Sequence, residues 1–205
     1  MSTRIYLVRH GETEWNALKK FQGHSDISLS DVGRLQATRL ANHMVKYKID
    51  AAYASDLSRA RETAEIIAEK FDIPVVCKKQ LREINFGCWE GLTISEIKAN
   101  YHGIVTKWWE DPAGTQIPDG EIFTDLVKRV ILSLEEIICK HSGQDVMVVS
   151  HGGVVRSIIC HVLGINLKEY WRLQLNNCSL NIIDFPDSQL KNGILELFNC
   201  SYDNL

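Results

Sequence analysis

The sequence predicts an α/β fold with a largely parallel sheet, and three observations support this. Short apolar runs alternate twice with amphipathic stretches between residues 5 and 77, a pattern typical of parallel strands joined by helices. Two apolar runs, Ile5 to Val8 and Asp145 to Ser150, are each followed closely by a histidine–glycine pair. The 205 residues, 45% hydrophobic and 24% charged, are enough to bury the core of one domain. We therefore expect residues 1–205 to fold as a single domain.

Composition narrows the classes of partner that the chain is expected to bind. The net charge of −3 provides no general attraction for nucleic acid, so an anion site would need a local cluster of cations. The apolar run near the N-terminus has four residues, too few for a secretory or membrane-spanning segment, which predicts a cytoplasmic protein without a membrane partner. The six cysteines include no Cys-x-x-Cys pair and suggest neither a disulfide framework nor a zinc site.

The first third of the chain predicts strand, helix and strand. Ile5 to Val8 is a short buried strand that stops where Arg9 and His10 begin. Residues 14–28 have no clean periodicity and are interpreted as a loop that lines a pocket. Ser30 is the expected N-cap of a helix whose apolar positions run from Ala37 to Val45. The second strand is expected at 49–54.

The next helix places an arginine where a helix disfavours one. Ser55 and Asp56 are the expected caps, and the apolar stripe runs from Ala60 to Phe71. Arg59 falls in the first turn, where the helix dipole disfavours a cation unless an anion lies nearby. A phosphate partner would explain it, and a solvated surface arginine is the alternative. A further strand is expected at 74–77.

The strand–helix rhythm breaks between residues 81 and 120, which suggests a lid-like insertion at about 84–120. Glu83 stands close to Ile84 and Phe86, where a carboxyl group suits general acid catalysis, although a surface position is equally compatible with the sequence. Tryptophans gather in the segment that follows. They either shape a substrate pocket or form the core of the insertion. They are Trp89, Trp108 and Trp109.

The last third repeats the pattern of the opening. A long helix is expected from Gly120 and Glu121 to Ile138, followed by a central strand that ends at His151. The helix after this strand points its N-terminal amides at whatever lies beside His151. Irregular chain bordering the site is expected at 175–179, and the closing strands at 181–184 and 194–199.

Two histidines and two arginines therefore converge on the carboxyl edge of the predicted sheet, where open α/β sheets bind ligands. A neutral His10 imidazole can attack phosphorus and form a phosphohistidine. Guanidinium groups match phosphoryl oxygens, so Arg9 and Arg59 would stabilise the transition state, and His151 would donate a further hydrogen bond. Glu83 is the candidate acid for the leaving oxygen. Arg-His-Gly alone would fit a surface turn equally well.

No phosphate-cradling Gly-x-x-x-x-Gly-Lys motif and no aspartate-rich metal cradle occurs in the sequence. A nucleotide-cradling or metal-dependent mechanism is therefore not expected, and no cofactor is predicted.

Four motifs in order resemble those of the histidine phosphatase superfamily, which includes cofactor-dependent phosphoglycerate mutases, broad-specificity phosphatases and α-ribazole phosphatases. They are Leu7-Val8-Arg9-His10-Gly11-Glu12-Thr13, Ser55-Asp56-Leu57-Ser58-Arg59-Ala60-Arg61-Glu62-Thr63-Ala64, Leu81-Arg82-Glu83 and Ser150-His151-Gly152-Gly153. The resemblance implies a three-layer α/β/α sandwich with a mostly parallel mixed sheet.

The same resemblance implies a role for each site residue. His10 is the phosphorylated nucleophile, and Glu83 is the proton donor. The phosphate pocket is completed by Arg9, Arg59, His151 and Gly152. Asn16 and Gln22 stand where family members often contact the phosphoryl group.

Within this superfamily the sequence favours hydrolysis of a small phosphorylated metabolite. Mutases hold a second acidic group through a basic patch in a longer insertion, whereas only Lys98 and Lys107 are cationic between Trp89 and Gly120. Residues 82–91 and 171–177 are similar to bacterial α-ribazole phosphatases of cobalamin assembly, and broad-specificity phosphatases share much of this pattern. A phosphoglycerate mutase and a non-catalytic module that binds phosphorylated ligands are the alternatives.

Overall fold

A six-stranded mixed sheet forms the centre of the protein, in a computed structural model that describes residues 1–202. The strand order is β3-β2-β4-β1-β5-β6, and the first four of these strands run parallel while β5 and β6 run antiparallel. The strands are β1 Thr3–Arg9, β2 Ala51–Ala54, β3 Val75–Cys77, β4 Asp145–Ser150, β5 Leu180–Phe185 and β6 Ile194–Cys200.

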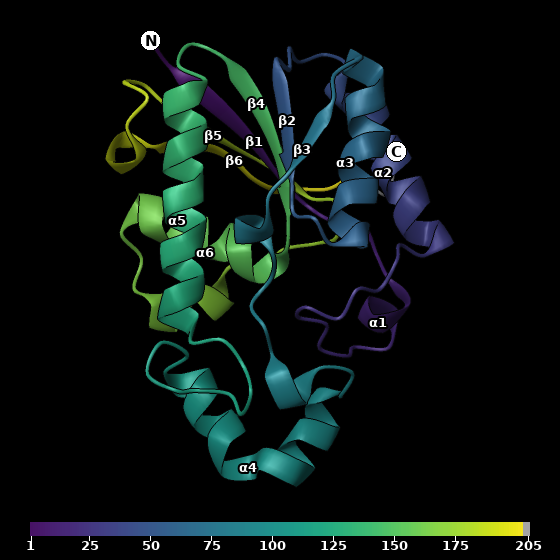
Figure 1. The fold of residues 1–205 in the computed structure, drawn as a ribbon, viewed down its shortest axis with the longest axis vertical. Helices are drawn as coiled ribbons and strands as arrows, with labels where there is room; N and C mark the ends of the chain where they lie inside the picture. The colour runs from purple at the N-terminus through teal and green to yellow at the C-terminus, as the bar shows by residue number, and fades with distance from the viewer. Residues whose placement is uncertain (203–205) are drawn as a thin grey trace.

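Helices cover both faces of the sheet, which confirms the three-layer sandwich (Figure 1). Tyr6 and Val8 of β1 pack in the layer with α2 and α3, whereas Ile5 and Leu7 pack in the layer with α5 and α6. Side chains alternate across a strand, so a strand covered on both faces must be apolar at every position. The helices are α1 Glu14–Ala17, α2 Asp31–Met44, α3 Ser58–Ala68, α4 Ile94–Glu110, α5 Phe123–Lys140 and α6 Gly152–Leu163. Among the described residues, no helix combines the length and apolarity that crossing a membrane requires.

The two histidine-bearing strands lie side by side at the centre of the sheet. Strand β1 pairs with β4 in parallel, with Arg9 opposite Ser150. The backbone N–H of His10 then donates to the Ser150 carbonyl at 2.9 Å. Because both strands end at this point, His10 and His151 emerge at the same edge of the sheet.

Several expected boundaries differ from the structure, among them those of α1, α3 and α5. Residues 14–28 contain the short helix α1, closed by a capping box between Thr13 and Asn16. Helix α3 begins at Ser58 and has no side-chain cap, because the Asp56 carboxylate is occupied by Arg82 at 2.7 Å. Helix α5 begins at Phe123 rather than near Gly120.

Residues 84–120, where an insertion was expected, contain a helix that the sequence did not predict. Helix α4 begins with a capping box between Thr93 and Glu96 and is kinked at Tyr101. It lies past the carboxyl ends of the parallel strands, at the end of the molecule opposite the N-terminus (Figure 1). Trp89 and Trp108 are fully buried core residues, so of the two alternatives the one in which these tryptophans form a core holds for this pair.

Candidate active site

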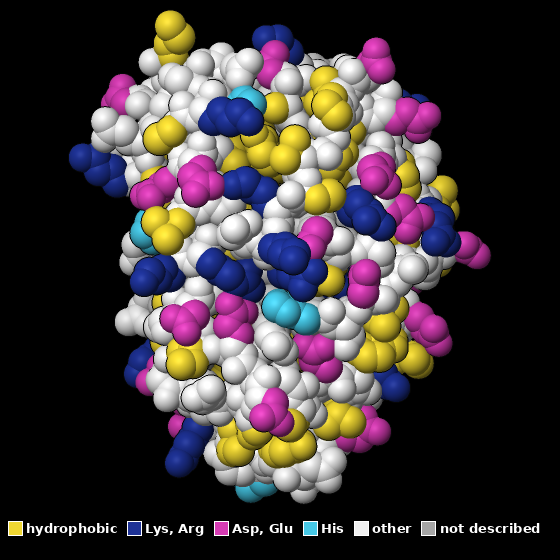
Figure 2. Space-filling view, viewed as in Figure 1, with side chains coloured by type: hydrophobic (Ala, Val, Ile, Leu, Met, Phe, Trp, Pro, Cys, Tyr) yellow, Lys and Arg dark blue, Asp and Glu magenta, His cyan; other side chains and the backbone are white. Residues whose placement is uncertain are grey.

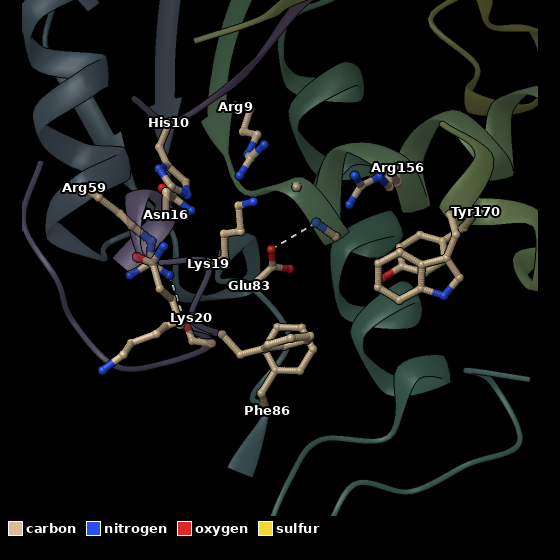
Figure 3. A pocket seen from close by; sticks show the side chains of 16 residues that line it. Arg9, His10, Asn16, Lys19, Lys20, Arg59, Glu83, Phe86, Arg156 and Tyr170 are labelled. Atoms are coloured by element: carbon tan, nitrogen blue, oxygen red, sulfur yellow. Dashed lines mark hydrogen bonds between the residues drawn. The ribbon is translucent and has the colours of Figure 1, made fainter. Parts of the chain in front are cut away.

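A cavity of about 200 Å³ opens at the carboxyl edge of the parallel strands (Figure 3). Arg9 and His10 enter it from the end of β1, Arg59 from the first turn of α3, and Glu83 from the segment after β3. Gly152 and the next residues of α6 form another wall. The four chain segments that carry the sequence motifs therefore meet at one pocket.

His10 is held with one ring nitrogen occupied and the other available. The ring is 3% exposed, and its Nδ1 lies 2.7 Å from the carbonyl oxygen of Gly11. Because a carbonyl can only accept, Nδ1 carries the hydrogen and Nε2 presents a lone pair. Burial, with the charges of Arg59 and Arg9, holds the pKa of His10 well below its usual value. The side chain is therefore a neutral imidazole at physiological pH.

The glycine that follows His10 is required by close packing. A Cβ atom at Gly11 would lie 2.6 Å from the carbonyl oxygen of Gly33 in α2. Any larger residue would push the backbone at Gly11 away from this helix. The backbone position that orients His10 thus depends on Gly11.

Two buried arginines flank the histidine and are held by backbone carbonyls. Arg9 Nη1 donates to Leu175 O at 2.7 Å, and Arg59 donates to Ser25 O at 2.9 Å and Gly23 O at 2.8 Å. Burial lowers the pKa of each arginine to about 10, so both remain cationic at neutral pH. Neither arginine makes an ion pair with a carboxylate in residues 1–202. Their charges are therefore available to a bound anion.

His151 completes this group from the end of β4. Its ring centroid lies 5.1 Å from that of His10, in an edge-on arrangement. The side chain is fully buried, and burial, with the charges of Arg59 and His10, holds its pKa well below the usual value. His151 is thus a second neutral imidazole beside the first.

Several buried polar atoms around His10 have no hydrogen-bond partner within residues 1–202. Leaving a buried donor unpaired costs about 1–3 kcal/mol, so such a concentration indicates a site built for a ligand. The unpaired nitrogens are Arg9 Nε, Arg59 Nε and His151 Nδ1 and Nε2. Arginine nitrogens only donate and each neutral imidazole supplies one donor, so an oxyanion is the matching ligand.

Glu83 is fixed by two backbone amides. One carboxylate oxygen accepts from Gly153 N at 3.0 Å, and the other accepts from Ile84 N at 3.0 Å (Figure 3). Behind it, the Glu83 carbonyl accepts from Arg129 Nη2 at 2.9 Å. Glu83 is the one carboxylate among the cavity-lining residues described.

The remaining sequence-predicted residues also border the cavity. Asn16 lies in the capping box of α1, with its Oδ1 accepting from Asn177 Nδ2 at 3.2 Å. Gln22 is 7% exposed, and its Oε1 has no partner within the described chain. Gly152 lines the cavity, and a Cβ atom at this position would lie 3.5 Å from Arg9 Nε.

Three cations and several aromatic side chains of the cavity were not singled out from the sequence. Arg156, Lys19 and Lys20 line the pocket, as do aromatic side chains from separate segments. Lys19, Lys20 and Phe21 lie within residues 14–28, the segment that was expected to line a pocket. Lys and Arg side chains gather across the middle of this face (Figure 2). Helical spacing places Arg156 on the same face as Gly152 and Gly153, and this spacing could have predicted that Arg156 lines the pocket. The missed aromatic residues are Phe21, Tyr170 and Trp171.

Comparisons with known proteins agree with this geometry. The model of the histidine phosphatase superfamily (branch 1) matches residues 5–197. The chain is 34% identical over 194 residues to phosphoserine phosphatase 1 of Hydrogenobacter thermophilus, covering 95% of this chain and 91% of the relative. It is 34% identical over 185 residues to the probable phosphoglycerate mutase GpmB of Yersinia pestis, covering 90% and 86%.

The fold is also similar to those of solved structures. Bacillus stearothermophilus YhfR superposes with a TM-score of 0.91 at 31% identity, covering 98% of each chain. A putative α-ribazole-5′-phosphate phosphatase of Escherichia coli superposes with a TM-score of 0.87 at 26% identity, covering 97% of this chain and 96% of that one.

Proposed function

The chain belongs to the histidine phosphatase superfamily, and on that premise we propose that it hydrolyses a small phosphorylated metabolite through a phosphohistidine on His10. The observation that carries the proposal is the state of the His10 ring. Its Nε2 is unprotonated and lies among buried donors that have no partner in residues 1–202. A nucleophile and an oxyanion site thus share one pocket.

In the first step, His10 Nε2 attacks the phosphorus and the bond from phosphorus to the ester oxygen breaks. Arg9, Arg59 and His151 donate hydrogen bonds to the equatorial oxygens as their charge grows. Glu83, protonated at this stage, gives its proton to the leaving oxygen, which departs as an alcohol. Asn16, Gln22 and Gly152 border the same oxygens and complete the proposed binding site.

The second step reverses the role of Glu83. Its carboxylate takes a proton from a water molecule, and that water attacks the phosphorus of the phosphohistidine. The bond from phosphorus to His10 breaks, inorganic phosphate leaves, and the neutral ring and the protonated acid are restored. The two backbone amides on Glu83 keep the carboxyl group at one place through both steps.

We further propose that this reaction needs no metal ion, because two fixed guanidinium groups supply the positive charge. Treatment with a chelator, followed by activity measurement in metal-free buffer, is expected to leave turnover unchanged. Loss of activity that is restored by adding a divalent cation would refute metal independence and leave the role of His10 standing.

The central test is to trap the covalent intermediate. Brief exposure to a labelled phosphomonoester is expected to give a label that is stable in base and lost in acid, as for a phosphohistidine. His10→Ala should abolish both label and turnover. His161→Ala, which changes an exposed histidine on α6, is the matched control. Full labelling of the His10→Ala protein would overturn the proposal.

A mutase is the second candidate, and two observations favour it. The chain is 34% identical to a probable phosphoglycerate mutase, and the pocket contains cations from outside the insertion, among them Arg156 and Lys19. The low basic content of the insertion is therefore a weaker argument against a mutase than the sequence indicated. A coupled assay for conversion of 3-phosphoglycerate to 2-phosphoglycerate, after priming with a bisphosphate, separates the two activities.

The physiological substrate is proposed at a finer level from the sequence resemblance, with α-ribazole 5′-phosphate in cobalamin assembly as the first candidate. We also propose a cytoplasmic location and a lid role for residues 84–120, within one domain.

A screen of phosphorylated metabolites tests the proposed substrate. Failure to turn over any phosphomonoester, in a folded protein that binds phosphate, would favour the non-catalytic binding module.

A further inference from the structure

Arg156 extends from α6 into the cavity with its side chain held in place (Figure 3). Its Nε donates to the carbonyl oxygen of Leu173 at 2.7 Å. The guanidinium carbon lies 5.7 Å from the ring centroids of both Tyr170 and Trp171. A guanidinium that is fixed in this way loses little side-chain entropy when it binds a ligand.

The charge of Arg156 has no carboxylate partner within residues 1–202, although a second cation lies close to it. The Cβ position of Gly152 would be 3.5 Å from Arg156 Nη1 and 3.5 Å from Arg9 Nε. Arg156 also lowers the pKa of Arg9, second only to burial among the causes. Two neighbouring guanidinium groups repel each other unless an anion lies between or beside them.

The position of Arg156 relative to Glu83 indicates which part of the substrate it meets. Gly153, whose N–H holds the Glu83 carboxylate at 3.0 Å, precedes Arg156 by three residues on the same face of α6. In the close-up, Glu83 lies between His10 on one side and Arg156 with Tyr170 on the other (Figure 3). A leaving group that receives its proton from Glu83 therefore extends toward Arg156.

We infer that Arg156 binds a carboxylate carried by the leaving group, so that the substrates are small phosphorylated carboxylic acids rather than the α-ribazole 5′-phosphate that the sequence resemblance suggests. This inference rests on the proposed function, because it assigns the leaving-group side of that site. The free Nη groups of Arg156 match a carboxylate in geometry and charge. A cavity of about 200 Å³ favours a compact group beyond the phosphate rather than a large ring system.

Two pairs of substrates that differ only at the carboxylate test the inference. They are O-phosphoserine against O-phosphoethanolamine, and 3-phosphoglycerate against glycerol 3-phosphate. The wild type should prefer the carboxylate member by about tenfold or more in kcat/KM, as expected for a charge-assisted hydrogen bond. Arg156→Met should abolish the preference while retaining turnover of the members that lack a carboxylate.

The ratio within each pair does not depend on how much of a preparation is correctly folded. Arg172→Met is the matched control, because Arg172 is exposed and pairs with Glu169 at 2.9 Å. Equal preference in the wild type, or an Arg156→Met loss that is the same for both members, would overturn the inference. The latter would show that Arg156 acts on the phosphoryl group itself.

Failure of the proposed function has a different signature. In that case the wild type would turn over none of the four substrates, nor p-nitrophenyl phosphate. Calorimetric titration of the His10→Ala protein with the same pairs then tests Arg156 alone. Tighter binding of O-phosphoserine than of O-phosphoethanolamine, lost on adding Arg156→Met, would support the carboxylate site. Equal binding would refute it.

Discussion

Glu83→Gln separates proton donation from every other function of the pocket. The two carboxylate oxygens of Glu83 each accept one backbone N–H, from Ile84 and Gly153, at 3.0 Å. Glutamine keeps the size of the side chain and one acceptor oxygen but turns an amide NH₂ toward one of these N–H groups. It cannot deliver a proton to a leaving oxygen at neutral pH.

The size of the effect should depend on the leaving group. A positioned general acid contributes about 10²- to 10⁴-fold to the rate, or roughly 3–5 kcal/mol of barrier. An alkyl phosphate leaves as a strongly basic alkoxide and should lose this whole contribution. Nitrophenolate is a weak base and needs little protonation, so its phosphate ester should lose less than about tenfold.

The assay compares kcat/KM for glycerol 3-phosphate and p-nitrophenyl phosphate in the wild type and in Glu83→Gln. Thermal unfolding is followed in parallel, because the lost amide hydrogen bond costs about 1–3 kcal/mol of stability. Glu110→Gln makes the same change on the exposed end of α4 and is the control. Equal losses for both esters would remove Glu83 from the role of proton donor.

Three further predictions concern the anion site and its supports. Inorganic phosphate at 100 times its Kd should stabilise the protein by about 2.7 kcal/mol and raise Tm by roughly 5–10 °C. Arg59→Met should remove most of this shift in Tm, because Arg59 has an unpaired buried nitrogen in the anion site. An unchanged shift would contradict the assignment of Arg59. The depressed pKa values of His10 and His151 mean that the unfolded chain binds protons first as pH falls, so stability should fall below about pH 6.5 by up to about 1.4 kcal/mol per pH unit for each ring. Chemical denaturation of His10→Asn should show a shallower slope, whereas an unaltered slope would place the titration elsewhere. Gly153→Ala should reduce turnover of alkyl phosphates more than 10-fold, because its Cβ would collide with the Glu83 carboxylate, and wild-type kcat would show that Glu83 tolerates displacement.

The sequence predicted those parts of the site that follow directly from strand ends. Ile5 to Val8 and Val146 to Val149 are apolar throughout because both faces of β1 and β4 are covered. Parallel pairing of these strands is enough to bring His10 and His151 together. Arg59 could be assigned to the anion site because it lies in the first turn of a helix, where the positive end of the helix dipole disfavours a cation unless an anion is near.

The parts that the sequence did not predict depend on contacts between distant segments. Helix α4 has β-branched and aromatic residues, Gly103 and a kink at Tyr101, which weaken its helical periodicity. Asp56 is a residue type that often caps a helix, but in the structure its carboxylate pairs with Arg82 instead. This ion pair between distant residues could not be predicted from the sequence near either of them. Arg156 is notable only because no carboxylate within residues 1–202 pairs with it, and that depends on how distant segments are arranged by the fold.

The way the charges are held explains how one small pocket can bind a dianion and also donate a proton. Arg9 and Arg59 are fixed by carbonyl oxygens, which position a guanidinium without neutralising it. A carboxylate in place of these carbonyls would have to be displaced by the phosphate, and the cost of breaking that ion pair would be subtracted from affinity. Glu83 is likewise fixed by backbone amides, which position its carboxyl group without tying up a cation of the anion site. Backbone groups thus keep the acid and the cations apart within a single cavity.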